Sequence, residues 1–409
     1  MRDILQKAIL VSKADKKDID QISLDLKIFL EKIKDIKAEI FVGGSFAKNT
    51  LIKKKRYDVD LFVMYKNGKN ISNLLKSYLV RKKIPFTELH GSRNYFQVKV
   101  SPILTIELVP IVKIRKAAEA ENITDISPLH VSYIANKIKA NKNLSSEICL
   151  AKSFCFSQEC YGAESYISGF SGYSLEVLVS YYGSFANFLR AMVKYKHEKI
   201  VIDPMKYYKG RAEVIGALNI SKINSPIIVV DPVQKERNIV AALSHRTFLD
   251  FVRKAKRFLA KPSLNYFVKK EKKWGKGIIL DVSIKSDKID IVGAKFKKLY
   301  GFLIFKMERN GFVFSKTDWK FDEHTGKCSI FLGIKKIEPY LFIKGPPVKV
   351  KEEYLKKFKK KHKKISIKTG FYYATEKNKF KDVNSFLKVF LERERKTLET
   401  MHVKKIFLS

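Results

Sequence analysis

Two aspartates, Asp58 and Asp60, lie two residues apart in the segment YDVDLFVM at positions 57–64, and they constrain this chain more than any other feature. Apolar residues alternate with them as in a β-strand, so both carboxylates are expected on the same face. Two like charges side by side repel unless a cation lies between them, and magnesium with phosphate oxygens is a common solution. An Asp-x-Asp pair alone is also typical of a solvated strand edge.

A glycine-rich turn comes shortly before the aspartates. Gly43, Gly44 and Ser45 follow the apolar run 38–42, so the backbone can turn sharply and direct N–H groups and a hydroxyl at a polyanion. A Gly-Gly-Ser turn alone is more often just a turn. Combined with the acidic pair, it indicates half of a nucleotide site.

A third carboxylate, Glu107, lies in the alternating segment LTIELVPI at 104–111 and can stand opposite Asp58 and Asp60. Phosphoryl transfer with two metal ions needs a third carboxylate, because one ion activates the attacking hydroxyl while the other holds the triphosphate. In isolation, a strand glutamate facing solvent explains Glu107 slightly better. Its apolar flanks favour the metal site.

The charge balance predicts the kind of partner. The 409 residues include 82 Lys plus Arg against 41 Asp plus Glu, a net charge of +41, which implies a large polyanion and leaves RNA, DNA and an anionic membrane open. No apolar run approaches a membrane-spanning length, and the N-terminal segment mixes its charges instead of separating them as a signal peptide does. We expect two to four folded domains and no membrane insertion.

The cysteines and histidines do not predict a metal site. The four cysteines lack CxxC spacing, and no two of the seven histidines stand at helical ligand spacing. So few cysteines suit a reducing cytoplasm. They are expected to be buried thiols, and they are Cys149, Cys155, Cys160 and Cys328.

Two predicted helices carry further candidate residues. The segment 124–140 predicts a helix with Ser127 as its N-cap and His130 near its start, and a second helix over 147–160 carries Lys152 and ends near Tyr161. A lysine among apolar neighbours usually snorkels to solvent. The functional alternative is that these histidine, lysine and tyrosine side chains hold a triphosphate.

The next segments leave their roles open. GFSGY at 169–173 leads into a long apolar helix at 174–194, and its glycines permit either close helix packing or close ligand approach. A turn at Asp231 and Pro232 precedes Arg237 and another helix that extends to Phe258. Arg237 is either a surface charge or a reader of base edges.

From about Lys261 the chain is strongly basic. Clusters at 269–277, 295–300 and 356–364 interleave cations with aromatic residues, as a surface along an RNA backbone would. A solvated helix face explains any single cluster equally well, but three together favour a ribonucleoprotein-like binding domain. Its possible stacking or core aromatics are Tyr266, Trp274, Phe296 and Tyr354.

The joint order of these motifs resembles one family. GGS, DVD, IELVP, SPLHVSYI, YGAESYISGFSGYSLEVLVSYYG, VVDPVQKERNIVAALS, GFVFSKTDW and GPPVK follow one another as in the class I, archaeal-type CCA-adding enzymes, which are tRNA nucleotidyltransferases. Gly-Ser followed by Asp-x-Asp marks the whole polymerase-beta-like superfamily, poly(A) polymerases included. The order across most of the chain is more specific than any one motif.

The resemblance implies an α+β multidomain chain. It predicts a polymerase-beta-like nucleotidyltransferase head with a mixed sheet and helices at 1–142, a mainly helical neck that recognises the nucleotide at 143–258, and a basic, ribonucleoprotein-like body and tail that bind tRNA at 259–409. It further implies a cytoplasmic enzyme that acts on the acceptor stem and 3′ end of tRNA with CTP, ATP and Mg²⁺, without a membrane. Monomer and homodimer are both compatible with it.

The resemblance also assigns roles to residues. Asp58, Asp60 and Glu107 would be catalytic and would bind the metal. The nucleotide would contact Gly44, Ser45, Lys48, His130, Lys152, Tyr161 and Arg237. The tRNA would contact Lys295, Lys297, Lys298, Gly345, Pro346, Pro347 and Lys349. Two positions depart from the family pattern, because Glu107 replaces an aspartate and Leu51 replaces a tryptophan.

The implied reaction is template-independent addition of CCA with release of pyrophosphate. An arginine only donates hydrogen bonds, so Arg237 would meet the ring-nitrogen acceptor of C or A and oppose the ring N–H of U or G. Two rival hypotheses remain. One is another RNA nucleotidyltransferase, such as a poly(A) polymerase or an enzyme that adds only part of CCA, and the other is a catalytically silent RNA-binding protein.

Overall fold

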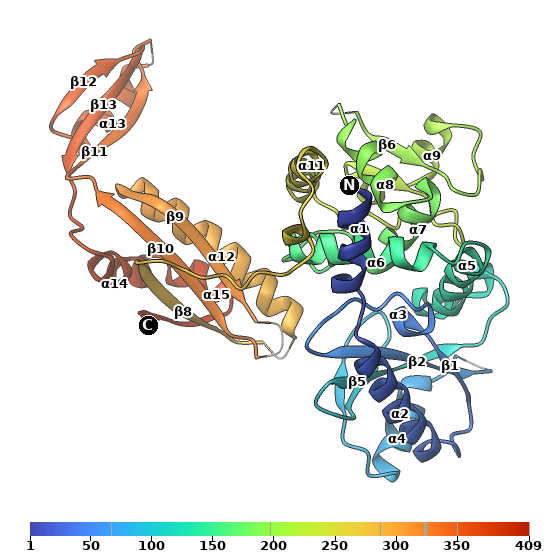
Figure 1. The fold of residues 1–409 in the computed structure, drawn as a ribbon. Helices are drawn as coiled ribbons and strands as arrows, with labels where there is room; N and C mark the ends of the chain where they lie inside the picture. The colour runs from blue at the N-terminus through green and yellow to red at the C-terminus, as the bar shows by residue number, and fades with distance from the viewer. Residues whose placement is uncertain (67, 197, 287, 323–324, 350, 409) are drawn as a thin grey trace. The chain divides into compact units, whose positions relative to one another are not determined.

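The protein is described by a computed structural model that covers residues 1–66, 68–196, 198–286, 288–322, 325–349 and 351–408. The chain divides into two compact units, residues 1–270 and 271–409. Separate sheets and helical layers in both units confirm the predicted α+β class (Figure 1). Within the described residues, no helix is long and apolar enough to cross a membrane.

The first unit begins with helices and a mixed five-stranded sheet in the order β1-β2-β5-β4-β3. Only β2 and β5 are parallel neighbours. The alternating residues Val59, Leu61 and Val63 of β2 are fully buried and pack in one core with residues of α2 and α4. The elements are α1 (Arg2–Ser12), α2 (Lys16–Lys32), β1 (Glu39–Val42), α3 (Gly44–Ala47), β2 (Tyr57–Tyr65), α4 (Ile71–Arg81), β3 (Thr87–Leu89), β4 (Tyr95–Lys99) and β5 (Leu104–Val112).

The rest of the first unit is mainly helical. Its core is rich in phenylalanine, and Tyr266 packs there with its ring stacked 6.0 Å from that of Phe154. The elements are η1 (Ala117–Glu119), η2 (Ile123–Ile126), α5 (Ser127–Ala140), α6 (Leu144–Ser157), α7 (Gly172–Tyr182), α8 (Phe185–Val193), β6 (Ile200–Ile202), α9 (Arg211–Ala217), α10 (Ile220–Ile223), β7 (Ile227–Val229), α11 (His245–Ala260) and η3 (Leu264–Tyr266).

Two predictions about these helices are wrong. The single helix at 174–194 is two helices, because Gly183 ends α7 with a left-handed φ of 78° and Ser184 caps α8 by accepting from the N–H of Asn187. Ser127 is the first residue of α5 and not its N-cap. The side-chain cap lies one turn earlier, where Asn122 accepts from the N–H of Thr124 at the start of η2.

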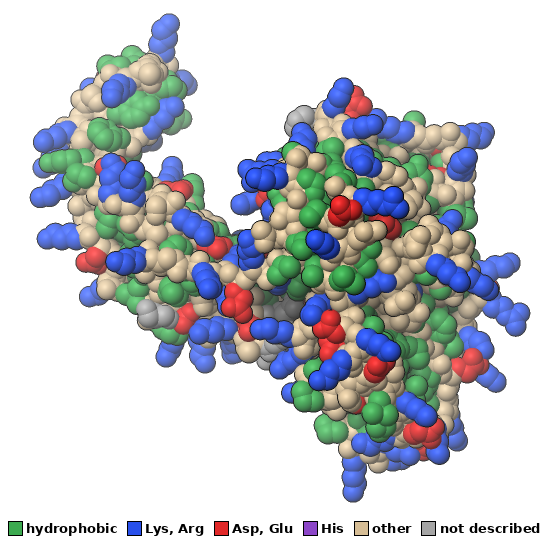
Figure 2. Space-filling model, in the orientation of Figure 1, with side chains coloured by type: hydrophobic (Ala, Val, Ile, Leu, Met, Phe, Trp, Pro, Cys, Tyr) green, Lys and Arg blue, Asp and Glu red, His purple; other side chains and the backbone are tan. Residues whose placement is uncertain are grey.

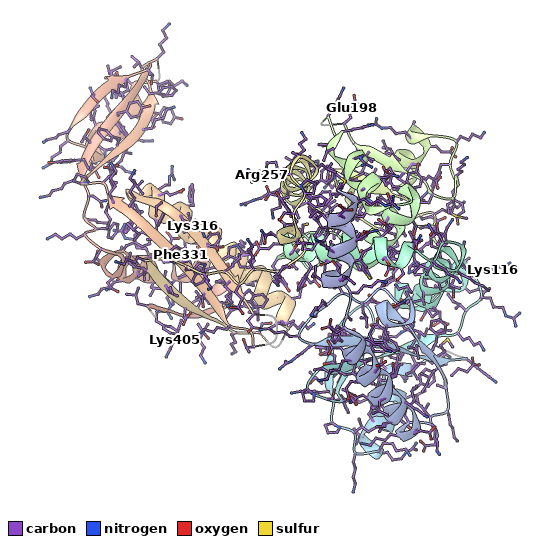
Figure 3. All side chains as sticks on the ribbon, in the orientation of Figure 1. Lys116, Glu198, Arg257, Lys316, Phe331 and Lys405 are labelled. Carbon is purple, nitrogen blue, oxygen red and sulfur yellow. The ribbon has the colours of Figure 1, made fainter. Side chains whose placement is uncertain are left out.

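The second unit contains two sheets. Four antiparallel strands in the order β14-β8-β10-β9 share a core with α12 and α14, and α13 packs against β11 of a three-stranded sheet in the order β11-β13-β12. Lys316 and Lys405 are exposed on β9 and β14, the two outer strands of the larger sheet (Figure 3). The elements are β8 (Ile278–Ile284), α12 (Ile289–Arg309), β9 (Phe312–Phe321), β10 (Cys328–Ile337), β11 (Tyr340–Pro347), α13 (Glu352–Lys361), β12 (Ile365–Lys368), β13 (Phe371–Lys377), α14 (Val383–Arg393), α15 (Arg395–Thr400) and β14 (Val403–Leu408).

The candidate stacking aromatics of the second unit differ in burial. Phe296 lies fully in the core, and the Trp274 ring stacks on buried Phe331 while its indole N–H donates to Asp318. Phe296 is therefore a core residue, whereas Trp274 is half-buried. Tyr354 on α13 is 56% exposed, and the Lys357 amine lies 5.9 Å from its ring centroid. The prediction that all four cysteines are buried thiols is confirmed.

Candidate active site

The three candidate carboxylates lie on neighbouring strands. The parallel register of β2 and β5 places Asp60 directly opposite Glu107 and Asp58 opposite Thr105. Asp58 is exposed, whereas Asp60 and Glu107 are partly buried. The predicted juxtaposition of Glu107 with the aspartate pair is therefore present in the sheet, and it follows from the period-two pattern of both strands.

The charges of these acids oppose one another. Burial, and then the negative charge of Asp58, raise the pKa of Asp60 to about 6 although Lys48 opposes the shift. Burial and the adjacent Asp60 raise the pKa of Glu107 to about 7. The two side chains are hydrogen-bonded to each other, and Glu107 Oε1 also accepts from Gln97 Nε2 at 2.7 Å. Near neutral pH, a cation that binds between Asp60 and Glu107 can therefore displace a proton from the pair.

This donor set suits a hard divalent cation. The ligands are carboxylate oxygens, which such ions prefer, and a cation between them would relieve the repulsion that raises both pKa values. Over the described ranges of the chain, no three His, Cys, Asp or Glu side chains are already gathered as a ready-made metal cage. The residues present fit a metal by their chemistry and their mutual repulsion.

The glycine turn packs directly over the acids. Gly43 N–H donates to the carbonyl of Asp60 at 2.8 Å, which ties the turn to β2. Gly44 has a φ of 65°, and a Cβ built on it would lie 1.9 Å from Asp60 Oδ2. Only glycine fits there, so Gly44 allows the phosphate-binding turn predicted from the sequence to approach the carboxylates closely.

Two lysines from distant segments meet behind this turn. Lys152 is 1% exposed, and its amine donates to Ser45 Oγ at 3.0 Å and to Glu176 Oε1 at 2.7 Å. Lys48 is also buried and donates to Glu176 Oε2 at 2.7 Å. The interpretation of Lys152 as a snorkelling side chain is wrong. Two ammonium groups share one carboxylate, so the cluster carries a net positive charge beside Ser45.

Glu176 is not among the site residues predicted from the sequence. It stands in the apolar run LEVLV, where the helical period predicts core, and it is fully buried. Burial alone would raise its pKa, but the charges of Lys152 and Lys48 hold that pKa below its ordinary value. The available signal was the charge itself, since a glutamate within an apolar helix needs a buried cation as its partner.

A second buried acid, Asp231, gathers three other side chains. Asp231 Oδ2 lies 2.8 Å from His130 Nε2 and accepts from Arg237 at 3.2 Å, while Oδ1 accepts from the Tyr173 hydroxyl at 3.1 Å. The rings of His130 and Tyr173 lie 4.2 Å apart. The hydrogen bond from His130 and the charge of Arg237 keep the pKa of Asp231 low despite its burial. His130 is therefore brought to Arg237, and the sequence had indicated only a turn at Asp231.

Tyr161 lies near the first turn of α7. A Cβ built on Gly172 would lie 2.9 Å from the Tyr161 hydroxyl and 3.8 Å from Lys152 Cε. Burial raises the pKa of Tyr161 to about 12, so its hydroxyl stays protonated at neutral pH and can donate a hydrogen bond. The GFSGY glycine thus serves close packing against a candidate nucleotide-binding side chain.

Two known domain families match parts of the first unit. A nucleotidyltransferase domain matches residues 25–148, and the second domain of tRNA nucleotidyltransferase matches residues 146–268. The CCA-adding enzyme of Nanoarchaeum equitans is 35% identical over 361 residues, which are 87% of this chain and 88% of that protein. The chain belongs to the class I, archaeal-type CCA-adding enzymes.

More distant relatives carry the same family name. The CCA-adding enzyme of Pyrobaculum islandicum is 29% identical and covers 79% of this chain and 78% of its own length. That of Methanocaldococcus jannaschii is 26% identical over 95% of this chain and 90% of its own. A solved structure of the Cid1 poly(U) polymerase matches 64% of this chain and 95% of its own with a TM-score of 0.51 at 13% identity, which confirms the predicted polymerase-beta-like fold alone.

The residues that the family resemblance assigned to tRNA lie in the second unit. Lys295 on α12 donates to the carbonyl of Thr400 at 2.7 Å, whereas Lys298 and Lys349 are exposed. Gly345 makes room for Phe358, whose ring would lie 2.6 Å from an added Cβ. The remaining candidates are Lys297 on α12 and Pro346 and Pro347 at the end of β11. Figure 2 shows Lys and Arg side chains spread widely over the visible face of the molecule.

Proposed function

We propose that this chain adds C, C and A to the 3′ end of tRNA without a template, using CTP and ATP and releasing pyrophosphate. The proposal rests chiefly on one observation. In a chain that is 35% identical to a CCA-adding enzyme, the register of β2 and β5 pairs Asp60 with Glu107 under a turn whose Gly44 has no room for a side chain. This register places a metal-suited acidic pair beside a turn that suits phosphate binding.

The carboxylates define the reacting centre. We propose that Asp58, Asp60 and Glu107 hold magnesium, because all-oxygen donors suit that ion. When bound, magnesium supplies activation of the RNA 3′-hydroxyl and neutralises charge on the triphosphate. The hydroxyl attacks the α-phosphorus in line, the bond from that phosphorus to the bridging oxygen breaks, and pyrophosphate leaves. The proton of the hydroxyl passes to a carboxylate beside the metal.

The triphosphate belongs beside the glycine turn. Backbone N–H groups near Gly44, the hydroxyl of Ser45 and the amine of Lys152 converge there, and Lys48 adds positive charge from behind. Tyr161 offers a neutral hydroxyl near the same lysine. In a site of low dielectric, such charge-assisted hydrogen bonds are stronger than in water.

Base selection is assigned to Arg237. Its guanidinium only donates, so it matches the ring-nitrogen acceptors of cytosine N3 and adenine N1 and opposes the ring N–H of uracil or guanine. One side of the guanidinium is held by Asp231, which limits the directions in which the remaining N–H groups point. A fixed donor set reads base edges better than a mobile one.

The tRNA partner follows from charge and family. We propose that the basic second unit follows the RNA backbone. The proposed domains of the whole chain are 1–142, 143–258 and 259–409, and its proposed location is the cytoplasm. Lysine–phosphate contacts release counterions, so tRNA affinity should fall by about 10³-fold or more between 50 and 200 mM salt if six or more phosphates are neutralised. A fluorescence titration at several salt concentrations measures this slope, and a flat response would contradict the basic-surface assignment.

One assay tests the reaction. Purified protein and magnesium are incubated with tRNA that ends before CCA, with CTP, ATP, UTP and GTP supplied singly and together, and products are read at nucleotide resolution. Ordered addition of C, C and A supports the proposal. Long A tails would instead identify a poly(A) polymerase, addition of only C or only A would identify a partial enzyme, and no addition would favour a silent RNA-binding protein.

A further inference from the structure

Glu176 lies among the groups expected to bind the triphosphate, yet it cannot bind a triphosphate itself. It is fully buried and negatively charged, and both oxygens are occupied. Oε2 accepts from Lys48, and Oε1 accepts from Lys152 and from the hydroxyl of Thr50 at 3.1 Å. A carboxylate in this place fixes where two ammonium groups point and limits their repulsion. Its contribution to nucleotide binding is therefore exerted through the lysines.

Tyr173 has the corresponding positioning role beside Arg237, the residue proposed to select the base. Its hydroxyl donates to Asp231, the acid that also holds His130 and Arg237, and its ring packs against the imidazole. Burial, and then the negative charge of Asp231, raise the pKa of Tyr173 well above its ordinary range. The hydroxyl is therefore a permanent donor that fixes the orientation of the Asp231 carboxylate.

Glu176, which we call the triphosphate anchor, and Tyr173, which we call the base anchor, both lie in one short stretch of α7. Tyr173 and Glu176 are three residues apart, so they lie on the same side of the helix and about 4.5 Å apart along its axis. The first turn is fixed by Ser171, whose side chain accepts from the N–H of Ser174, and by Gly172 against Tyr161. A helical turn held in this way is stiff, so it transmits the position of one anchor to the other.

We propose that α7 is a rigid spacer between the two ends of the nucleotide site, with Glu176 and Tyr173 as its positioning residues. The proposal rests on the function assigned above to this site. A nucleotide whose triphosphate is held by the lysines then presents its base at a fixed distance from Arg237. Loosening the triphosphate anchor should consequently weaken base selection, and loosening the base anchor should weaken triphosphate binding.

The decisive variant is Glu176→Gln, which keeps size and removes charge. We expect the ratio of kcat/KM for CTP to that for UTP, measured on tRNA lacking CCA, to fall by about fivefold or more although Glu176 lies at the triphosphate end. A purely local or structural role would lower both kcat/KM values by the same factor. An unchanged ratio in an active protein overturns the spacer alone, whereas a wild-type protein that adds no nucleotide overturns the proposed function as well.

A matched control and a second variant complete the test. Glu147→Gln changes another helical glutamate, which accepts from the N–H of Phe185 at 2.8 Å and touches neither Lys48 nor Lys152 in the contacts described, and its CTP:UTP ratio should equal that of wild type. An equal fall in this control would overturn the proposal. If Glu176→Gln does not fold, as judged by circular dichroism, Tyr173→Phe decides. Its inhibition constant for inorganic tripolyphosphate should rise by about threefold, because a neutral-to-charged hydrogen bond is lost at the far end of the helix. An unchanged constant overturns the proposal.

Discussion

Two sets of acids in the first unit are both removed from water, yet their pKa values move in opposite directions. Burial and mutual repulsion raise the pKa of Asp60 and Glu107, on β2 and β5. Glu176 and Asp231 are fully buried and keep low pKa values, because each faces cationic side chains. Burial raises the pKa in both sets, so the balance of the neighbouring charges and hydrogen bonds decides the direction in which each pKa finally moves.

The two sets of acids differ in the groups that balance their charge. For the strand acids, burial and the neighbouring negative charges outweigh the opposing charge of Lys48, and we propose that a bound metal relieves this repulsion. Glu176 on α7 is balanced by Lys48 and Lys152 and so orders the two lysines that we propose contact the nucleotide. We propose that the strand acids bind a ligand and that the helix acid positions side chains around it.

The largest effect is expected from removing the strand acids. The double variant Asp58→Ala, Asp60→Ala should lose about 10³-fold or more of nucleotide addition, because the metal-supported transition state loses its ligands. Its affinity for tRNA should be unchanged. Single-turnover extension of tRNA lacking CCA measures the loss, with Asp20→Ala, an exposed position on α2, as the control. Residual addition near the wild-type rate would refute the metal assignment.

A smaller loss is expected on the cationic side of the comparison. Lys152→Met removes the amine that reaches Ser45, and kcat/KM for CTP should fall by about 100-fold, since a charge-assisted hydrogen bond to the triphosphate disappears. Steady-state kinetics with CTP and ATP measure the effect. Lys137→Met, at an exposed lysine of α5, should behave as wild type. Equal kinetics in both variants would remove Lys152 from the nucleotide site.

The raised pKa values predict how metal binding depends on pH. A metal must displace the proton shared by Asp60 and Glu107, whose pKa values are about 6 and about 7. Affinity for Mn²⁺ should therefore rise by about tenfold per pH unit up to pH 7 and level off above pH 8. Isothermal titration calorimetry between pH 6 and 8 measures the slope. A constant affinity over this range would show that neither acid is protonated in the free protein.

The sequence predicted the strand acids well because their pattern is local. Asp58, Asp60 and Glu107 stand in alternating runs, so their face follows from the strand period, and the register that pairs them follows from two apolar strands packing in parallel. The glycine turn was also predictable from the sequence. In the structure, the backbone at Gly44 approaches Asp60 too closely for any side chain. Leu51, where the family pattern has tryptophan, is partly buried against the core that contains the apolar residues of β2.

The contacts that could not be predicted from the sequence join residues that are far apart along the chain. Glu176 meets Lys48 from 128 positions away, and Asp231 meets His130 across 101 positions, so no local period reveals either pair. The break between α7 and α8 was hidden by an apolar run that continues through it, although Gly183 and Ser184 are ordinary end and start signals. The predicted site residues and domain limits remain proposals.

The most direct test of the comparison applies one chemical change to both sets of acids. Asp60→Asn and Glu176→Gln each turn a carboxylate into an amide, and urea unfolding at pH 7 without metal measures the free energy of each variant. Asp60 has a folded pKa of about 6 against an ordinary 3.8, so its ionised form destabilises the fold above pH 4, and Asp60→Asn should raise the free energy of unfolding by about 1–3 kcal/mol. Glu176→Gln should lower it by about 3 kcal/mol, because two buried lysines lose their counter-charge. Changes of the same sign in both variants would contradict the account.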